Sequence, residues 1–143
     1  MEAADRPLIT AASLRARDEW SRGFPGAEVV WEEEADEGIG IGFDGIDPSA
    51  MMRAFCRTKS TWPEVLEWYQ TVLGSLGWVG AAVRSDWWWE WTAPELPGER
   101  FLVMDRSRVP EFLQAWAVPQ DTMLYEVLFR VRTSADDDAV SHA

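Results

Sequence analysis

The 143-residue chain has little of the residue types on which most enzyme chemistry depends. It contains one histidine (His142), one cysteine (Cys56), one lysine (Lys59) and no asparagine. Catalysis by a Ser–His or Cys–His pair requires an imidazole as the base, and His142 is the second residue from the end of the chain. A zinc site needs more cysteine and histidine than the chain provides. We therefore predict a non-enzymatic protein with no catalytic residues, no bound metal and no cofactor.

Long apolar runs and a cationic N-terminus are missing as well. No stretch approaches the roughly 20 apolar residues that a membrane-spanning helix requires. Residues 1–7 carry acidic side chains where a signal peptide has basic ones. A single cysteine excludes an intramolecular disulfide, and we interpret Cys56 as a small buried hydrophobe. These features favour a cytoplasmic protein without membrane association.

Positive charge is scarce relative to negative charge. The chain has 13 basic and 25 acidic residues, which gives a formal net charge of −12. Such a field repels phosphate, so we expect no binding to nucleic acid or to anionic membrane surfaces. A basic protein partner would be attracted; the alternative is that the charge only keeps the protein in solution. The oligomeric state does not follow from the sequence.

The length is that of one domain, which we expect to span 1–143, with an ordered core over about 8–132 and tails at 1–7 and 133–143. The clearest element is a helix over 62–76. Thr61 and Glu64 match a capping box, and an apolar stripe follows at three- and four-residue spacing. Gly77 suits the left-handed position that ends a helix, with Trp78 packing back on Leu73.

Alternating apolar and polar residues, separated by turn residues, predict strands elsewhere. We expect strands over 28–34, 38–43, 50–58, 78–84, 86–92, 100–105 and 122–132, and short helices near 8–22 and 108–118. Strands joined by short turns favour antiparallel pairing. The predicted fold class is α+β, an antiparallel β-sheet of four to seven strands with helix 62–76 packed on one face.

The segment Ser60-Thr-Trp-Pro-Glu-Val-Leu-Glu-Trp-Tyr-Gln-Thr-Val-Leu-Gly-Ser-Leu-Gly-Trp78 resembles a recurring segment of small bacterial α+β domains of unknown function. The resemblance covers about residues 50–132 and implies a strand before the helix and strands after it. It brings no catalytic residues with it. The insertion at 106–121 and the glycine-rich stretch before residue 50 depart from that pattern.

Two local motifs have a chemical interpretation that their surroundings disfavour. Oxygen ligands for a hard metal ion are available from Glu32, Glu34, Asp36, Asp44 and Asp47, but successive strand residues point to opposite faces and do not converge. Gly38-x-Gly-x-Gly resembles a phosphate-binding loop, yet acidic residues flank it and no helix start follows. We interpret both motifs as an acidic hairpin with a glycine-rich strand.

Ten tryptophans are the most unusual feature of the composition. On a strand, Trp87, Trp89 and Trp91 share one face, which we expect to lie in the core. Trp88 and Glu90 would lie on the opposite face, together with Leu124 and Leu128 of the last strand. This face is either an exposed binding surface or covered by residues 8–22 or 108–118.

The leading hypothesis is a non-enzymatic domain that binds a protein, with a basic partner expected. By analogy of charge and size alone, small acidic immunity or antitoxin-like proteins behave in this way. The candidate binding residues are Trp88, Glu90, Leu124, Leu128, Glu32 and Glu34. The alternative is a small-molecule or carbohydrate-binding domain with a tryptophan-lined pocket, and a carboxylate-only enzyme is the third interpretation.

Overall fold

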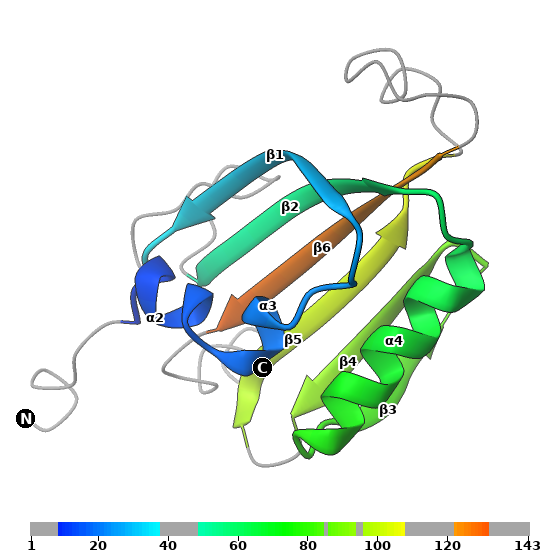
Figure 1. The fold of residues 1–143 in the computed structure, drawn as a ribbon. Coiled ribbons are helices and arrows are strands. Elements are labelled where there is room, and N and C mark those ends of the chain that lie inside the picture. The colour runs from blue at the N-terminus through cyan, green and yellow to red at the C-terminus, as the bar shows by residue number, and fades with distance from the viewer. Residues whose placement is uncertain (1–8, 38–48, 85, 94–95, 108–121, 132–143) are drawn as a thin grey trace, which may run out of the picture.

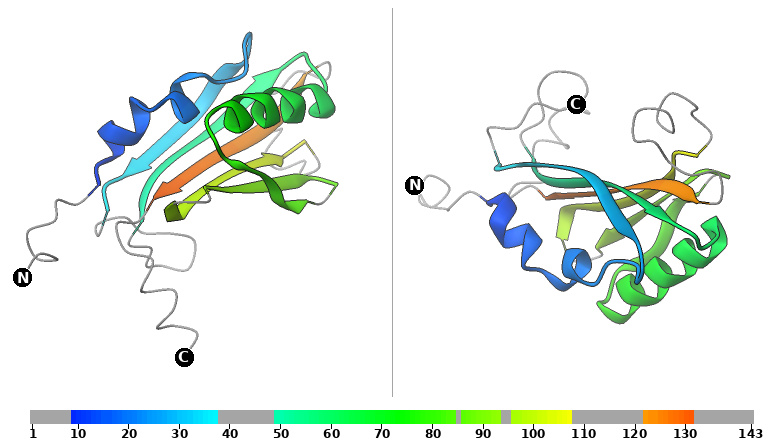
Figure 2. Two further views of the ribbon diagram at one scale, coloured as in Figure 1. Left: turned by 90° about the horizontal axis from the view of Figure 1, so that it is seen from below. Right: turned by 45° about the horizontal axis from the view of Figure 1, so that its top comes forward.

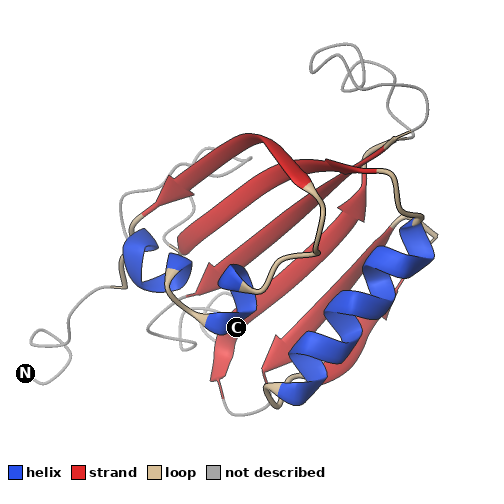
Figure 3. Ribbon diagram, viewed as in Figure 1, coloured by secondary structure: helices blue, strands red, loops and turns tan. Residues whose placement is uncertain are grey.

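One six-stranded sheet with helices on one side makes up the fold (Figure 1). The structure, a computed structural model, describes residues 9–37, 49–84, 86–93, 96–107 and 122–131. The strands are β1 (Glu28–Ala35), β2 (Ala50–Thr58), β3 (Val79–Arg84), β4 (Trp88–Ala93), β5 (Leu96–Asp105) and β6 (Met123–Val131). The helices are α2 (Ala11–Arg15), α3 (Asp18–Ser21) and α4 (Trp62–Ser75). The predicted α+β class is confirmed (Figure 3).

The strand order is β1-β2-β6-β5-β4-β3, and every neighbouring pair is antiparallel. After β2 the chain crosses the sheet through α4 to reach the far edge at β3. It then returns strand by strand until β6 pairs with β2. Helix α4 lies within this crossover connection, and Figure 1 shows it running alongside β4. Figure 2 shows α2, α3 and α4 on the same side of the sheet.

Helix α4 begins and ends where its sequence signals predict. The Thr61 side chain accepts a hydrogen bond from the Glu64 N–H, and the Thr61 N–H donates to Glu64 Oε1 at 2.8 Å. At the other end Gly77 has a φ of 91°, and the Trp78 N–H donates to the Leu73 carbonyl at 2.9 Å. The capping box and the Schellman-type closure are therefore both present.

The single helix predicted near 8–22 is instead two short helices, α2 and α3. Thr10 caps α2 by accepting a hydrogen bond from the Ser13 N–H, but Arg17 has extended backbone angles and separates the two. The extended residue directs its guanidinium to Glu99 on β5, at 2.7 Å, and to Glu19, at 2.8 Å. A tertiary ion pair thus breaks a segment that local propensity alone would continue.

Strand alternation divides the sheet into two faces, and the register fixes which residues share them. Met52, Ala54 and Cys56 of β2 face the helices, and their partners on β6 are Phe129, Val127 and Tyr125. The core lies between this face and the helices. Met51, Arg53, Phe55 and Arg57 alternate with those β2 residues and lie on the opposite face of the sheet.

The tryptophan strand differs from its prediction at one residue. Trp91 is 1% exposed and Trp89 is half-buried, but Trp87 is 38% exposed. The expectation that Trp87 lies in the core is wrong because β4 begins at Trp88. Trp87 lies in a bend, and its carbonyl accepts a hydrogen bond from the Asp105 N–H at 2.7 Å. In a bend, strand alternation no longer sets the direction of the side chain.

Several predicted elements lie outside the described residues: the strand over 38–43, the helix over 108–118 and the tails at 1–7 and 133–143. In the described part of the chain, no helix has the length and apolar character needed to cross a bilayer.

Candidate functional site

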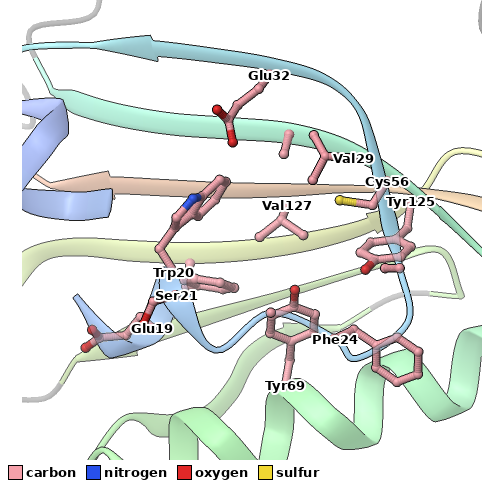
Figure 4. Close-up of a pocket in the computed structure, with 14 residues that line it drawn as sticks. Glu19, Trp20, Ser21, Phe24, Val29, Glu32, Cys56, Tyr69, Tyr125 and Val127 are labelled. Atoms are coloured by element: carbon pink, nitrogen blue, oxygen red, sulfur yellow. The ribbon is translucent and has the colours of Figure 1, made fainter. Parts of the chain in front are cut away.

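A cavity of about 220 Å³ opens on the helix side of the sheet (Figure 4). Its walls come from α3, from the connection between α3 and β1, from α4 and from strands β1, β2, β5 and β6. We call it the helix-side cavity. It forms because α2 and α3 cover one half of the sheet and α4 covers the other, so the strands between them are only partly covered.

Aromatic side chains make up much of the wall. Trp20 comes from α3, Phe24 from the connection that follows, Tyr69 from α4 and Tyr125 from β6. In Figure 4 the Trp20 ring, the Tyr69 hydroxyl and the Glu32 carboxylate point toward the same space. The cavity therefore combines flat apolar surfaces with a few polar groups, as binding sites for small molecules commonly do.

Three neutral polar groups lie close together in the wall. Hydrogen bonds link the Tyr125 hydroxyl to the Cys56 thiol and to the Tyr69 hydroxyl. Burial raises the pKa of Cys56 to about 11 against a smaller opposing effect of the Tyr125 hydrogen bond. Burial also raises the pKa of both tyrosines. All three groups are protonated at neutral pH, so they offer hydrogen bonds rather than nucleophiles.

Two carboxylates lie at the cavity and both have cationic partners. Glu19 accepts hydrogen bonds from Arg17, at 2.8 Å, and from the Trp78 indole N–H, at 2.9 Å. Burial acts to raise the pKa of Glu19, but these donors outweigh it and hold the pKa below its ordinary value. Glu32 accepts a hydrogen bond from Arg15 Nη2 at 2.8 Å. Both carboxylates are thus held in position by arginine side chains.

No lysine, arginine or histidine is among the described residues that line the cavity. Within the described ranges, moreover, no group of three histidine, cysteine or acidic residues is arranged to hold a metal ion. The helix-side cavity consequently combines aromatic walls, protonated hydroxyl and thiol groups and negative charge at its edge.

The residues predicted from sequence to form a binding surface are divided between the two faces of the sheet. Trp88 and Glu90 pair with Met104 and Leu102 of β5, and Leu102 pairs with Leu128, so these side chains share the face opposite the helices with Leu124. Leu124 and Leu128 are buried at 0% and 7% exposure. Glu32 and Glu34 lie on the helix side, where Arg15 Nη2 contacts both, at 2.8 and 2.6 Å.

The face opposite the helices holds an ionic network that sequence reasoning did not anticipate. Glu126 of β6 is fully buried, and its carboxylate accepts hydrogen bonds from Arg53 at 2.5 Å and from Arg106 at 2.8 Å. The Arg53 guanidinium also lies over the rings of Trp31 and Phe55, at 5.5 and 5.2 Å from their centroids. Long charged side chains thus cover apolar surface at the centre of this face.

Residues 8–22 are not what covers this face. Ala11 and Leu14 of α2 belong to the core on the helix side, so that proposed cover is wrong. The second candidate, 108–118, lies outside the described residues. At the edge of the face the exposed Trp87 ring lies 6.0 Å from Trp88, and the Arg106 guanidinium lies over it at 5.7 Å.

The sequence analysis did not predict this cavity. Of the residues that line it, only Glu32 and Cys56 were singled out from sequence. Trp20, Tyr69 and Tyr125 come from three elements that are far apart in the chain. Tyr69 belongs to the apolar stripe of α4, and such a stripe predicts burial without separating core from cavity. Comparisons with protein-family models, with curated proteins and with solved structures find no match to this chain.

Proposed function

We propose that this chain is a non-enzymatic binding domain that takes a small ligand in the helix-side cavity. The observation that carries the proposal is the aromatic wall of Trp20, Phe24, Tyr69 and Tyr125 around a space of about 220 Å³. Drug-sized sites are roughly 300–1,000 Å³, so a smaller ligand of a few non-hydrogen atoms is expected. The small-molecule-binding domain, which was the alternative hypothesis from sequence, thereby becomes the first candidate function.

Binding is favoured over catalysis by the state of the groups in the wall. A thiolate is the nucleophilic form of cysteine, and a pKa of about 11 leaves Cys56 almost fully protonated at neutral pH. The buried tyrosines are also held in their neutral forms. The Glu19 carboxylate accepts hydrogen bonds from Arg17 and Trp78, and these leave it poorly suited to accept a proton.

Two exposed valines allow a matched test of the cavity. Val29 lines the cavity and is 52% exposed, whereas Val79 is 45% exposed and lies at the start of β3, outside it. Val29→Trp should fill the mouth of the cavity at little cost in stability, and Val79→Trp adds the same ring elsewhere. The assay is a fragment screen by NMR, in which a Trp20→Phe variant identifies the Trp20 indole N–H signal.

Fragments that bind in the cavity should shift the Trp20 indole signal in the parent protein and in Val79→Trp. They should leave the spectrum of Val29→Trp unchanged. If no fragment shifts the Trp20 signal, or if Val29→Trp binds the same fragments as the parent protein, the cavity is not a ligand site.

Protein binding on the opposite face is the second candidate, because Trp87 is 38% exposed and lies next to Trp88 and beneath the Arg106 guanidinium. Tryptophan and arginine are the residues that dominate binding hot spots. A basic partner recruited by the net charge of −12 should associate more slowly as ionic strength rises. Trp87→Ala should abolish that complex, and unchanged affinity in this variant would exclude the face.

A further inference from the structure

Two ion-pair clusters at the helix-side cavity each carry more negative than positive charge. Arg15 Nη2 contacts Glu32 and Glu34, and these three groups carry one formal negative charge in excess. Arg17 likewise contacts Glu19 and Glu99, at 2.8 and 2.7 Å, which leaves a second negative charge in excess. Both clusters reach the cavity, one through Glu32 and the other through Glu19.

The aromatic rings inside the cavity also favour a bound cation, and the described lining residues contribute no positive charge. An aromatic ring carries negative charge density on its face, and cations bind over such faces. Trp20, Tyr69 and Tyr125 bring aromatic rings to the wall, and the described lining residues include no cationic side chain. The net charge of −12 extends this preference into solution, where it concentrates cations near the protein.

We propose that the helix-side cavity binds a small organic cation whose positive charge is covered by alkyl groups, such as a quaternary ammonium. This rests on the proposed function of the cavity and specifies its ligand. A bare ammonium loses strong hydration when it is buried and needs several acceptors in return, whereas a methylated one loses far less. Its methyl groups suit aromatic walls, and its charge is balanced by the Glu32 carboxylate, which points into the cavity. An anion finds no cationic partner in this wall.

The direct test compares three ligands of similar shape that differ in charge. Choline is the cation, 3,3-dimethyl-1-butanol is its neutral isostere and 3,3-dimethylbutyrate is a related anion. Titration calorimetry on the whole chain at low ionic strength should detect choline, with at least about tenfold weaker binding of the neutral isostere. The anion should not bind. Added salt should weaken the binding of choline, because part of the attraction comes from charge.

Variants then test the wall and the edge separately. Trp20→Ala should weaken choline binding roughly tenfold, and Trp20→Phe should retain most of it because an aromatic face is kept. Glu32→Gln should weaken binding roughly fivefold. Glu34→Gln is the matched control, since Glu34 contacts the same arginine but does not line the cavity, and it should change the affinity less than about twofold. Circular dichroism checks that each variant is folded.

The outcomes separate this inference from the function on which it rests. If 3,3-dimethyl-1-butanol binds as tightly as choline and both are lost in Val29→Trp, the cavity is a ligand site but charge selection is wrong. If choline fails to bind at millimolar concentration while neutral fragments shift the Trp20 signal, the inference is likewise overturned and the proposed function stands. Equal effects of Glu32→Gln and Glu34→Gln would contradict the assigned role of Glu32.

Discussion

Trp91→Ala is the substitution for which the structure gives the largest expected loss of stability among the tryptophans of β4. Trp91 is 1% exposed, its indole N–H donates to Gln70 Oε1 at 2.8 Å, and its ring lies 6.4 Å from that of Phe101. Truncation removes a large buried ring and leaves a cavity, which costs about 3–5 kcal/mol. The lost hydrogen bond keeps the expected value in the upper part of that range, because Gln70 loses its partner.

Trp87→Ala is the matched comparison, because the same residue type changes four positions earlier. Trp87 is 38% exposed and lies outside the strand, beneath the Arg106 guanidinium and next to Trp88. The expected loss is below about 1.5 kcal/mol, as for a partly exposed site. Strict strand alternation from 87 to 91 would instead give the two residues similar costs.

Urea denaturation followed by far-ultraviolet circular dichroism measures both losses without relying on tryptophan fluorescence. The free energy of unfolding in water and the slope with denaturant are fitted together for the parent protein and each variant. Trp91→Phe is the internal control: it keeps part of the apolar volume but not the hydrogen bond to Gln70, so its loss should lie between zero and that of Trp91→Ala. Losses that are equal for Trp87→Ala and Trp91→Ala, or larger for Trp87, would refute this assignment of faces.

Three further predictions concern α4, the opposite face of the sheet and the cavity. Leu73→Ala should cost about 2–5 kcal/mol in the same assay because Leu73 is fully buried, whereas Glu67→Ala, on the exposed side of α4, should stay within about 0.5 kcal/mol. Glu126→Ala should cost about 3–5 kcal/mol because it leaves Arg53 and Arg106 without their shared buried carboxylate; a loss below about 1 kcal/mol would contradict the network. The thiol of Cys56 should react slowly with a disulfide reagent in the native protein near pH 8, because only the thiolate reacts and its pKa is raised to about 11. Its rate should climb as the pH approaches that pKa, and rapid reaction near pH 8 would show that the thiol is not buried as described.

The elements whose signals lie within a few residues were predictable from sequence. Helix α4 is the clearest case: its capping box joins residues three apart, its stripe repeats every three or four, and Gly77 supplies the left-handed backbone that ends it. The faces of β2 were predictable for the same reason, since strand alternation depends only on the chain itself. Where that regularity ends, prediction also failed, as at Trp87, which precedes the first residue of β4.

Long-range pairing was not predictable in the same way. Nothing in β2 or β6 specifies that they become neighbours across 64 intervening residues between Thr58 and Met123. The helix predicted near 8–22 is divided at Arg17, which forms an ion pair with Glu99, 82 positions away in the chain. A residue pattern shows which side of a helix or strand is apolar and must be buried. It does not show which other element will bury it, because many apolar surfaces could do so.

The sequence by itself determined an α+β domain, its main helix, the alternation of its strands and an excess of negative charge. Only the tertiary structure decided that α2 and α3 leave strands partly uncovered beside α4, so that Trp20, Tyr69 and Tyr125 meet at one cavity. It also decided that Arg15 and Arg17 each face two carboxylates, which no charge count along the chain reveals. The reason is physical: local structure follows from steric and hydrogen-bonding preferences of adjacent residues, whereas a cavity and its field depend on which distant surfaces exclude water together.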